Sequence, residues 1–281
     1  MLPEAFTKRM KTLLAEEYGA FLDSFSRPRA VALRLNPLKT QAPPDLSGFS
    51  LRPVPWEPCG FYYDPETRPG KSAYHEAGLY YLQEASAMAP AALLDPQPGE
   101  RVLDLCAAPG GKSTQLAGKM RGRGLLVCNE INPKRAKILA SNIERLGIAN
   151  ALVLNEHPQR LEARFAGWFD KILVDAPCSG EGMFRKEEAA VTDWSEETVL
   201  MCARPSWARK FSKMRRPCWP RAVYWSIRPA RLRPRKMRRA SAHFCARTRT
   251  FPWKRPSRRG FLPGVPTGFP IPCRVWKRPS G

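Results

Sequence analysis

The stretch that decides the fold of this 281-residue chain is Val102-Leu-Asp-Leu-Cys-Ala-Ala-Pro-Gly-Gly-Lys-Ser-Thr-Gln-Leu-Ala117. Its first residues predict a strand, the small residues at 106–111 predict a tight loop, and the run from Ser113 predicts the start of a helix. Gly110 and Gly111 let the backbone approach a ligand closely, and the N-terminus of the helix offers N–H groups to an anionic group. Such a turn is typical of a site for a nucleotide-like cofactor.

The spacing of the glycines argues against two common nucleotide sites. A phosphate-binding P-loop needs a glycine where this chain has Cys106, and the G-x-G-x-x-G pattern of dinucleotide folds is absent. The next strand, residues 124–130, ends in Glu130, about twenty residues after the glycines, where an acid can hold both ribose hydroxyls of an adenosine. A third strand, residues 169–180, carries Asp175 and Cys178 at its C-terminal edge.

The remaining periodicity predicts an α/β protein. The expected elements outside the three strands are a helix over residues 3–24, a strand over 31–39, a proline-rich loop over 52–70, a turn leading into a helix over 75–88, a helix over 132–146 and a strand over 151–154. Strands alternate with helices from residue 102 onward, which implies a parallel sheet covered on both faces. Ligands of such sheets bind at the carboxyl ends of the strands.

The net charge of +22 would ordinarily indicate a nucleic-acid partner, but the charge is unevenly distributed. Residues 204–281 hold 23 of the 47 Lys and Arg residues and no Asp or Glu, so the first 203 residues are nearly neutral. No apolar run is long enough for a membrane span and the N-terminus lacks a signal peptide, so we expect a cytoplasmic protein. The eight cysteines contain no C-x-x-C pair, so neither a zinc site nor a disulfide framework is expected.

Three motifs carry a resemblance to a known family. Cys-Ala-Ala-Pro-Gly-Gly-Lys from Cys106, Asn-Glu ending at Glu130, and Val-Asp-Ala-Pro-Cys-Ser-Gly-Glu-Gly-Met-Phe-Arg-Lys from Val174 resemble the Nol/Nop/Sun (RsmB/RsmF-type) RNA 5-methylcytosine methyltransferases. The resemblance covers residues 1–203. It implies a Rossmann-like class I methyltransferase sheet, a small N-terminal α+β module and an irregular C-terminal tail. It also implies that the cofactor is S-adenosylmethionine and that the partner is RNA, ribosomal RNA in particular. The protein is expected to be a monomer.

We therefore expect three regions: an N-terminal RNA-binding-like module over residues 1–70, an incomplete S-adenosylmethionine-binding core over 71–203, and a basic, out-of-frame tail over 204–281. In the resembled family, a small N-terminal module with a similar arginine-asparagine-proline signature precedes the catalytic domain, and this module helps to hold RNA. Arg34 and Lys39 could do the same here, or they could lie on a solvated strand edge. The aromatic residues of the proline-rich segment are expected to pack on the core rather than to stack on bases: Trp56, Phe61, Tyr62 and Tyr63.

The resemblance assigns the cofactor to the glycine turn and to the strand ends that follow it. The expected cofactor-binding residues are Cys106, Ala107, Ala108, Pro109, Gly110, Gly111, Lys112, Glu130, Arg135, Glu156 and Asp175. Glu130 is the acid expected to hold the ribose. Glu156, the one carboxylate in the loop after residues 151–154, is expected to receive the adenine amino group. No metal site is expected.

Methylation of cytosine at carbon 5 needs a cysteine thiolate that adds to carbon 6, because carbon 5 alone is a poor nucleophile. The family uses two cysteines: one in a Thr-Cys motif that attacks, and one in Pro-Cys-Ser-Gly that helps to release the product. Asp175 and Cys178 match the second motif and are the expected catalytic residues. The Thr-Cys motif should follow further along the chain, but no such string exists there.

A shifted reading frame explains the missing motif. Codons can be chosen for Ile227-Arg-Pro-Ala-Arg-Leu232 that, read one base earlier, encode Tyr-Ser-Thr-Cys-Thr-Phe. In that frame the codon of the missing cysteine spans the codons of Pro229 and Ala230. We therefore expect a cytosine methyltransferase that is impaired as written and that folds poorly, since core strands are lost. Two alternatives stay open: that Cys178 is itself the nucleophile, or that the chain is a non-catalytic RNA-binding protein with a basic C-terminal arm.

Overall fold

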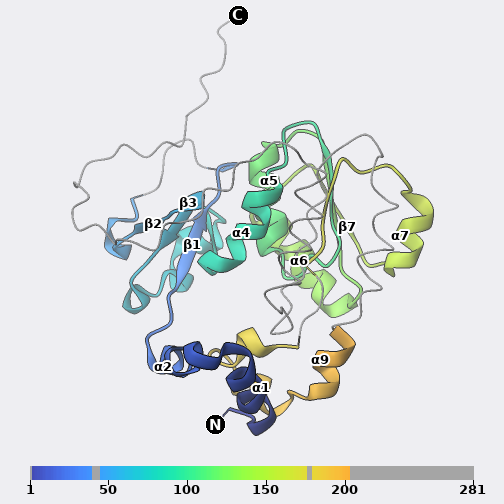
Figure 1. The fold of residues 1–281 in the computed structure, drawn as a ribbon. Helices are drawn as coiled ribbons and strands as arrows, with labels where there is room; N and C mark the ends of the chain where they lie inside the picture. The colour runs from blue at the N-terminus through green and yellow to red at the C-terminus, as the bar shows by residue number, and fades with distance from the viewer. Residues whose placement is uncertain (1, 40–44, 176–178, 203–281) are drawn as a thin grey trace, which may run out of the picture. The chain divides into compact units, whose positions relative to one another are not determined.

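The computed structural model describes residues 2–39, 45–175 and 179–202, and all of them fall within one compact unit. Two four-stranded sheets and the helices around them make up this unit (Figure 1). The tail over residues 204–281, Cys178, Pro229 and Ala230 lie outside the described residues. In the described part of the chain, no helix is both long and apolar enough to cross a membrane.

The N-terminal sheet is antiparallel and has the strand order β2-β3-β1-β4. Its strands are β1 (Ala32–Leu35), β2 (Arg52–Val54), β3 (Glu57–Tyr62) and β4 (Tyr80–Leu82). Four short helical turns connect them: η2 (Ser47–Phe49), η3 (Pro65–Thr67), η4 (Pro69–Lys71) and α3 (Ala73–Glu76). Leu33, Leu35, Leu46, Phe61 and Tyr80 form its core. The sheet extends beyond residue 70, the expected end of the N-terminal module, because β4 belongs to it, and the three-region division stays a prediction.

Two expected elements of this region are wrong. The segment 52–70 is not a loop throughout, because β2 and β3 form a hairpin within it. Pro53 lies in the edge strand β2, and Pro58 lies outside the part of β3 that pairs with β1, so neither proline removes a needed donor. The segment 75–88 is not a single turn and helix either, since β4 interrupts it by pairing with β1.

The aromatic residues of the hairpin mostly pack as expected. Phe61 is 9% exposed, and Tyr62 and Tyr63 pack partly buried against the core clusters. The prediction is wrong for Trp56, which is 44% exposed, although its Nε1–H donates to the carbonyl of Ala85 at 2.8 Å.

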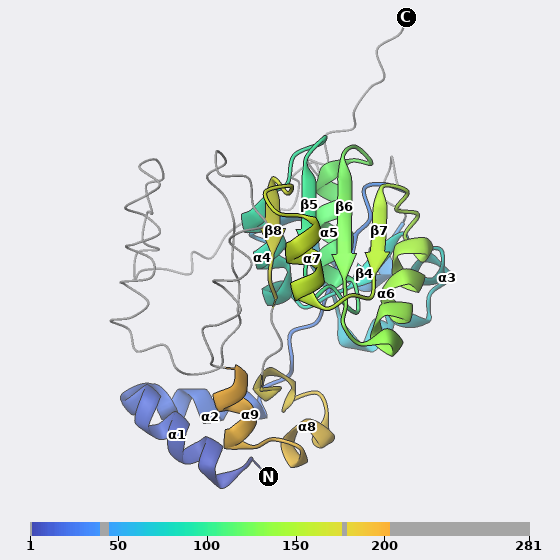
Figure 2. The same cartoon turned by 90° about the vertical axis from the view of Figure 1, so that its right-hand side faces the viewer.

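The second sheet is parallel, with the order β7-β6-β5-β8 (Figure 2), which confirms the expected Rossmann-like layer. Its strands are β5 (Arg101–Asp104), β6 (Leu125–Asn129), β7 (Ala151–Leu154) and β8 (Lys171–Leu173). Val102 and Leu126 pack in one core cluster with α4 (Ala85–Leu94), α5 (Gly111–Met120) and α6 (Pro133–Arg145). Leu103 and Val127 point to the other face and pack with α7 (Pro158–Arg164). The strands β5, β6 and β8 are therefore buried on both faces, whereas Leu152 of the edge strand β7 is 44% exposed.

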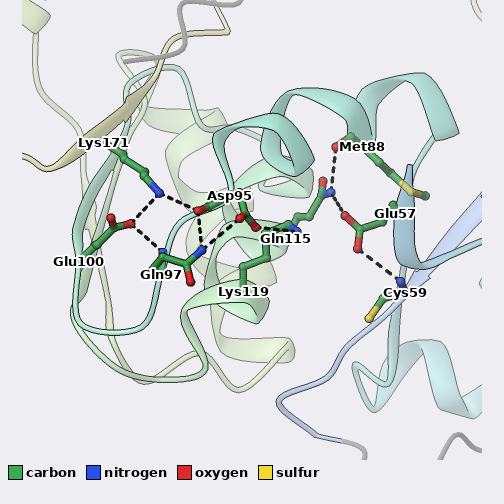
Figure 3. Close-up of polar contacts among 9 residues, drawn as sticks. All are labelled: Glu57, Cys59, Met88, Asp95, Gln97, Glu100, Gln115, Lys119 and Lys171. Atoms are coloured by element: carbon green, nitrogen blue, oxygen red, sulfur yellow. Dashed lines mark hydrogen bonds and ion pairs between the residues drawn. The ribbon is translucent and has the colours of Figure 1, made fainter. Parts of the chain in front are cut away.

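The strand β8 is fixed at its amino end by a buried cation. Lys171 is 3% exposed, and its Nζ lies 3.0 Å from Glu100 Oε2 and donates to the carbonyl of Asp95 at 2.6 Å (Figure 3). Within the described residues β8 pairs only with β5 and forms one edge of the sheet.

A helical cluster joins the start of the chain to residues 181–202. Its members are α1 (Glu4–Leu14), η1 (Ala15–Glu17), α2 (Tyr18–Ser26), η5 (Glu181–Met183), α8 (Glu188–Thr192) and α9 (Glu196–Cys202). Phe6, Met10 and Phe184 form its core, and the carboxylate of Glu181 pairs with Arg9. The single helix expected over residues 3–24 is broken at Ala15, whose φ is +46°.

Candidate functional site

The loops after β5, β6 and β7 are joined at the carboxyl edge of the parallel sheet. Asn129 Nδ2 donates to the carbonyls of Leu105 at 3.3 Å and Glu156 at 3.0 Å, and its Oδ1 accepts the N–H of Glu156. Asn155 Nδ2 donates to the carbonyl of Glu130 at 2.6 Å. The expected ribose and adenine acids therefore lie on neighbouring loops that share hydrogen bonds, at the edge where ligands of such sheets bind.

The glycine loop, defined here as residues 105–111, has its carbonyls held from several sides. Four successive carbonyls accept hydrogen bonds: Ala108 from Arg135 at 2.8 Å, Pro109 from Asn142 at 2.8 Å, Gly110 from the N–H of Thr114 at 2.8 Å, and Gly111 from Arg34 at 3.1 Å. In a planar trans peptide the N–H of the next residue points opposite to the carbonyl. The N–H groups of Gly110, Gly111 and Lys112 therefore point away from these partners, at the N-terminus of α5.

Gly110 is required at the turn into α5. Its φ is +114° with ψ 0°, a conformation that side chains rarely adopt, and an added Cβ would lie 3.2 Å from Leu139 Cδ1. The first-turn amides of α5 have no partner within the helix and carry the positive end of its dipole. The loop can therefore receive a carboxylate or a similar anionic group.

Glu130 is held in place at the end of β6. Its side chain is 3% exposed, Oε1 accepts the N–H of Asn132 at 2.9 Å, and Oε2 lies 3.3 Å from Arg135 Nη1. Arg135 also donates to the Ala108 carbonyl, so it links the acid to the glycine loop. Glu156, by contrast, is about one third exposed and pairs with Arg160 at 3.3 Å.

Asp175 lies just beyond β8 and pairs with the first turn of α5. Its Oδ2 lies 2.8 Å from Lys112 Nζ, and both side chains are less than one quarter exposed. The ion pair joins the first turn of α5, directly after the glycine loop, to the end of a third parallel strand. Cys178, three residues later, lies outside the described residues.

The glycine loop lies in a field of negative charge. Burial, with smaller contributions from the acidic residues Asp104, Glu130 and Asp175, raises the pKa of Cys106 to about 12. Cys106 therefore stays a neutral thiol at physiological pH and is unsuited to attack. The acidic side chains of Glu130 and Asp175 beside the loop favour a ligand that carries positive charge.

Asp104, the last residue of β5, lies beneath the loop and is almost fully buried. Burial raises its pKa to about 7, while the hydrogen bond from Ser113 Oγ at 2.7 Å and the charge of Lys112 oppose this rise. Its Oδ1 has no hydrogen-bond partner among the residues that the structure places.

We expect Asp104→Asn to gain stability relative to the unchanged protein as pH rises. The folded protein keeps the Asp104 proton up to pH of about 7, whereas the unfolded chain loses it near its usual pKa of 3.8. The stability that this proton provides is therefore lost between these two values, and asparagine does not titrate. Between pH 5 and 8 the difference in unfolding free energy should shift by about 2 kcal/mol in favour of the variant. Urea unfolding across this range measures the shift, and a constant difference would contradict it.

The structure brings most of the expected residues together. The loop residues from Cys106 to Lys112 lie beside Glu130, Arg135 and Asp175, and Ala107 and Ala108 are buried in the core. Sequence analysis missed the asparagines that join the loops: Asn129, Asn142 and Asn155. The available signal was a polar residue at or just after a strand end, as in Asn129 before Glu130.

Of the two alternatives left open for Arg34, the solvated strand edge is wrong, because Arg34 is 2% exposed. Lys39 is exposed, but its Nζ donates to the carbonyls of Ala77 and Arg145, both at 2.7 Å. Both cations therefore hold backbone carbonyls, and Lys39 lies near the C-terminus of α6, where positive charge is favourable.

Two family models match the chain. Residues 2–85 match the N-terminal domain of 16S rRNA methyltransferase RsmF, and residues 91–206 match 16S rRNA methyltransferase RsmB/F. Together they include well over half of the sequence.

Similar proteins carry related names. Ribosomal RNA small subunit methyltransferase F of Vibrio vulnificus is 42% identical over 219 residues, which are 72% of this chain and 45% of that protein. The protein of the same name from Salmonella paratyphi B is 40% identical over 211 residues, 70% of this chain and 44% of that protein. The chain therefore spans less than half the length of these relatives.

Two solved structures from Pyrococcus horikoshii are also similar. A methyltransferase homolog protein is 31% identical with a TM-score of 0.60, covering 71% of this chain and 65% of that chain. NSun6 is 19% identical with a TM-score of 0.64, covering 79% and 82%, and shares the fold.

Proposed function

Because this chain belongs to the family of RsmB/F 16S ribosomal RNA methyltransferases, we propose that it binds S-adenosylmethionine at the glycine loop and acts on ribosomal RNA. The observation that carries the proposal is the meeting of the glycine loop, Glu130 and the Lys112–Asp175 pair at one sheet edge. We also propose, as the sequence analysis expects, that the protein acts as a monomer in the cytoplasm.

The residues at this edge fit the cofactor's chemistry. The N–H groups of Gly110, Gly111 and Lys112 suit its methionine carboxylate, and Glu130 suits its two ribose hydroxyls. Glu156 is the proposed partner of the adenine amino group, and the hydrogen bonds by which Asn129 ties the Glu156 backbone to the end of β6 support this role. The surrounding carboxylates suit its positively charged amino and sulfonium groups. S-adenosylmethionine supplies an activated methyl group when it is bound.

The proposed target atom is carbon 5 of a cytosine. The ion pair with Lys112 orients Asp175. In this proposal the Asp175 carboxyl group lies near a ring nitrogen of the cytosine and supports the change of charge on the ring when the thiolate adds to carbon 6. Cys178, three residues further along, assists release of the product. Cys106 takes no part in attack, because burial keeps it a neutral thiol.

The chain as printed is impaired in this reaction, because no Thr-Cys motif supplies the attacking thiolate. The family match ends at residue 206, close to the point where the composition turns basic. Among the described strands β8 has one neighbour only, which is consistent with loss of the strands that would follow it.

A 5-fluorocytidine-containing RNA tests the target atom. Release of the enzyme normally requires a base to remove the hydrogen on carbon 5, and fluorine in its place cannot be removed in this way. A cysteine bonded to carbon 6 therefore stays attached to the RNA after methyl transfer. We expect the frame-restored protein to form this adduct with 16S ribosomal RNA only when S-adenosylmethionine is present. Denaturing gels detect the adduct as a band of reduced mobility. Methylated RNA without any adduct would point to a different target atom.

A further inference from the structure

One face of α5 is shaped to receive the N-terminal sheet. Gly111, Thr114, Gln115 and Gly118 recur at helical spacing, and the last three are buried. A Cβ on Gly111 would lie 3.2 Å from Tyr81 Cε1, and a Cβ on Gly118 would lie 3.1 Å from the Cγ of Pro37. The sheet therefore approaches the backbone of the helix directly, beginning at the glycine loop.

Arg34 is the charged residue at this contact. It comes from β1, is 2% exposed, and donates from Nη2 to the carbonyl of Gly111 at 3.1 Å and to Thr114 Oγ1 at 2.7 Å. Its Nε donates to Gln83 Oε1 at 2.9 Å. Burial lowers the pKa of Arg34 to about 10, so the side chain still carries its charge at neutral pH.

A buried carboxylate balances this charge through two glutamines. Gln83 must present its oxygen to Arg34, which only donates, so its Nε2 faces Oε1 of Gln115 at 3.3 Å. Gln115 Nε2 in turn donates to Glu57 Oε2 at 2.5 Å and to the carbonyl of Met88 at 2.8 Å (Figure 3). The amide dipoles therefore run head to tail from cation to anion.

We propose that Arg34 is a positioning residue for the cofactor loop, so that the N-terminal sheet completes the cofactor site. By holding the Gly111 carbonyl, Arg34 fixes the peptide plane whose other end is the N–H of Lys112. This N–H belongs to the set assigned to the cofactor's carboxylate, so this inference rests on the proposed function. Arg34 acts through the loop and does not touch the cofactor.

The matched control is Glu57. Arg34→Met and Glu57→Gln each remove one charge of the same buried network, but only Arg34 bonds to the glycine loop. If Arg34 merely balances charge in the core, the two variants should behave alike. If Arg34 positions the loop, only Arg34→Met should disturb the loop itself.

The test compares hydrogen exchange and ligand affinity in the full chain. Without ligand, we expect Arg34→Met to exchange amides of residues 107–116 at least tenfold faster, with residues 125–129 unchanged. Its affinity for S-adenosylhomocysteine should fall ten- to a hundredfold. Glu57→Gln should lower the melting temperature and yet leave loop exchange within twofold. Arg34→Lys keeps a single charged donor group, so its loop exchange and its affinity for S-adenosylhomocysteine should lie between those of Arg34→Met and the unchanged chain. This variant replaces Arg34→Met in the test if Arg34→Met does not fold.

Equal amide exchange of the loop in the Arg34 and Glu57 variants would overturn the proposal. An unchanged affinity for S-adenosylhomocysteine in Arg34→Met or Arg34→Lys would also overturn it. Failure of the unchanged chain to bind S-adenosylhomocysteine would refute the proposed function instead. The exchange comparison without ligand would still decide whether Arg34 positions the loop.

Discussion

Restoring the reading frame near codons 200–210 is expected to raise RNA methylation by a factor on the order of 10⁴ or more, since removal of a covalent nucleophile costs at least that much. The printed chain keeps the glycine loop, Glu130 and Asp175 but lacks the Thr-Cys motif. The corrected frame places that cysteine's codon across those of Pro229 and Ala230. Transfer of radiolabelled methyl groups from S-adenosylmethionine to 16S ribosomal RNA measures the difference.

The control for this comparison is Cys178→Ala in both frames. In the corrected frame the variant should still methylate RNA but release it slowly, because Cys178 is assigned to product release. Methylation by the printed chain at a similar rate, abolished by Cys178→Ala, would make Cys178 the nucleophile and refute the account of impairment. Salt-sensitive RNA binding without methylation in either frame would favour the basic-arm alternative.

Glu130→Ala is expected to weaken S-adenosylmethionine binding about a hundredfold. The carboxylate would accept two ribose hydroxyls, and hydrogen bonds to a charged group contribute about 1.5–3 kcal/mol each. A loss of about 3 kcal/mol corresponds to two powers of ten in affinity. Equilibrium dialysis with the radiolabelled cofactor measures this loss.

Glu144→Ala supplies the matched control, because Glu144 is an exposed acid on α6, which also carries Arg135. This substitution should change cofactor affinity less than twofold. If Glu130→Ala changed affinity as little as Glu144→Ala does, the ribose would be held elsewhere.

The sequence predicts the parallel half of the fold well, because its signals are local. The stretch 102–117 forms β5, the loop and α5, and Pro133 begins α6 as expected. Residues 151–154 form β7 with the expected bounds. In each case strand periodicity, a helix start and a glycine lie within a few residues of one another.

The N-terminal sheet was predicted less well, because its signals depend on distant partners. Pro53 and Pro58 favoured a loop, but β1 and the edge position of β2 allow strands there. Arg34 could be placed on a strand, yet its burial follows from Gly111 and Thr114, which lie some eighty residues away in sequence.

The site shows the same division. The glycines and Glu130 are predictable from spacing, because each follows a strand of the same sheet. The asparagines that hold the loops are not, because Asn142 reaches Pro109 from a different helix and Asn129 bonds to a loop 27 residues further along the chain. Polar residues that satisfy backbone groups across elements leave little local signal.

The most direct test of the central claim is calorimetric titration of the full chain with S-adenosylhomocysteine, beside Gly110→Val as the variant whose loop cannot form. The account predicts saturable binding at one site per chain and none to Gly110→Val, whose side chain opposes the +114° φ. The account would be contradicted if the unchanged chain showed no saturable binding although its circular dichroism shows the folded sheet. It would also be contradicted if both proteins bound S-adenosylhomocysteine equally.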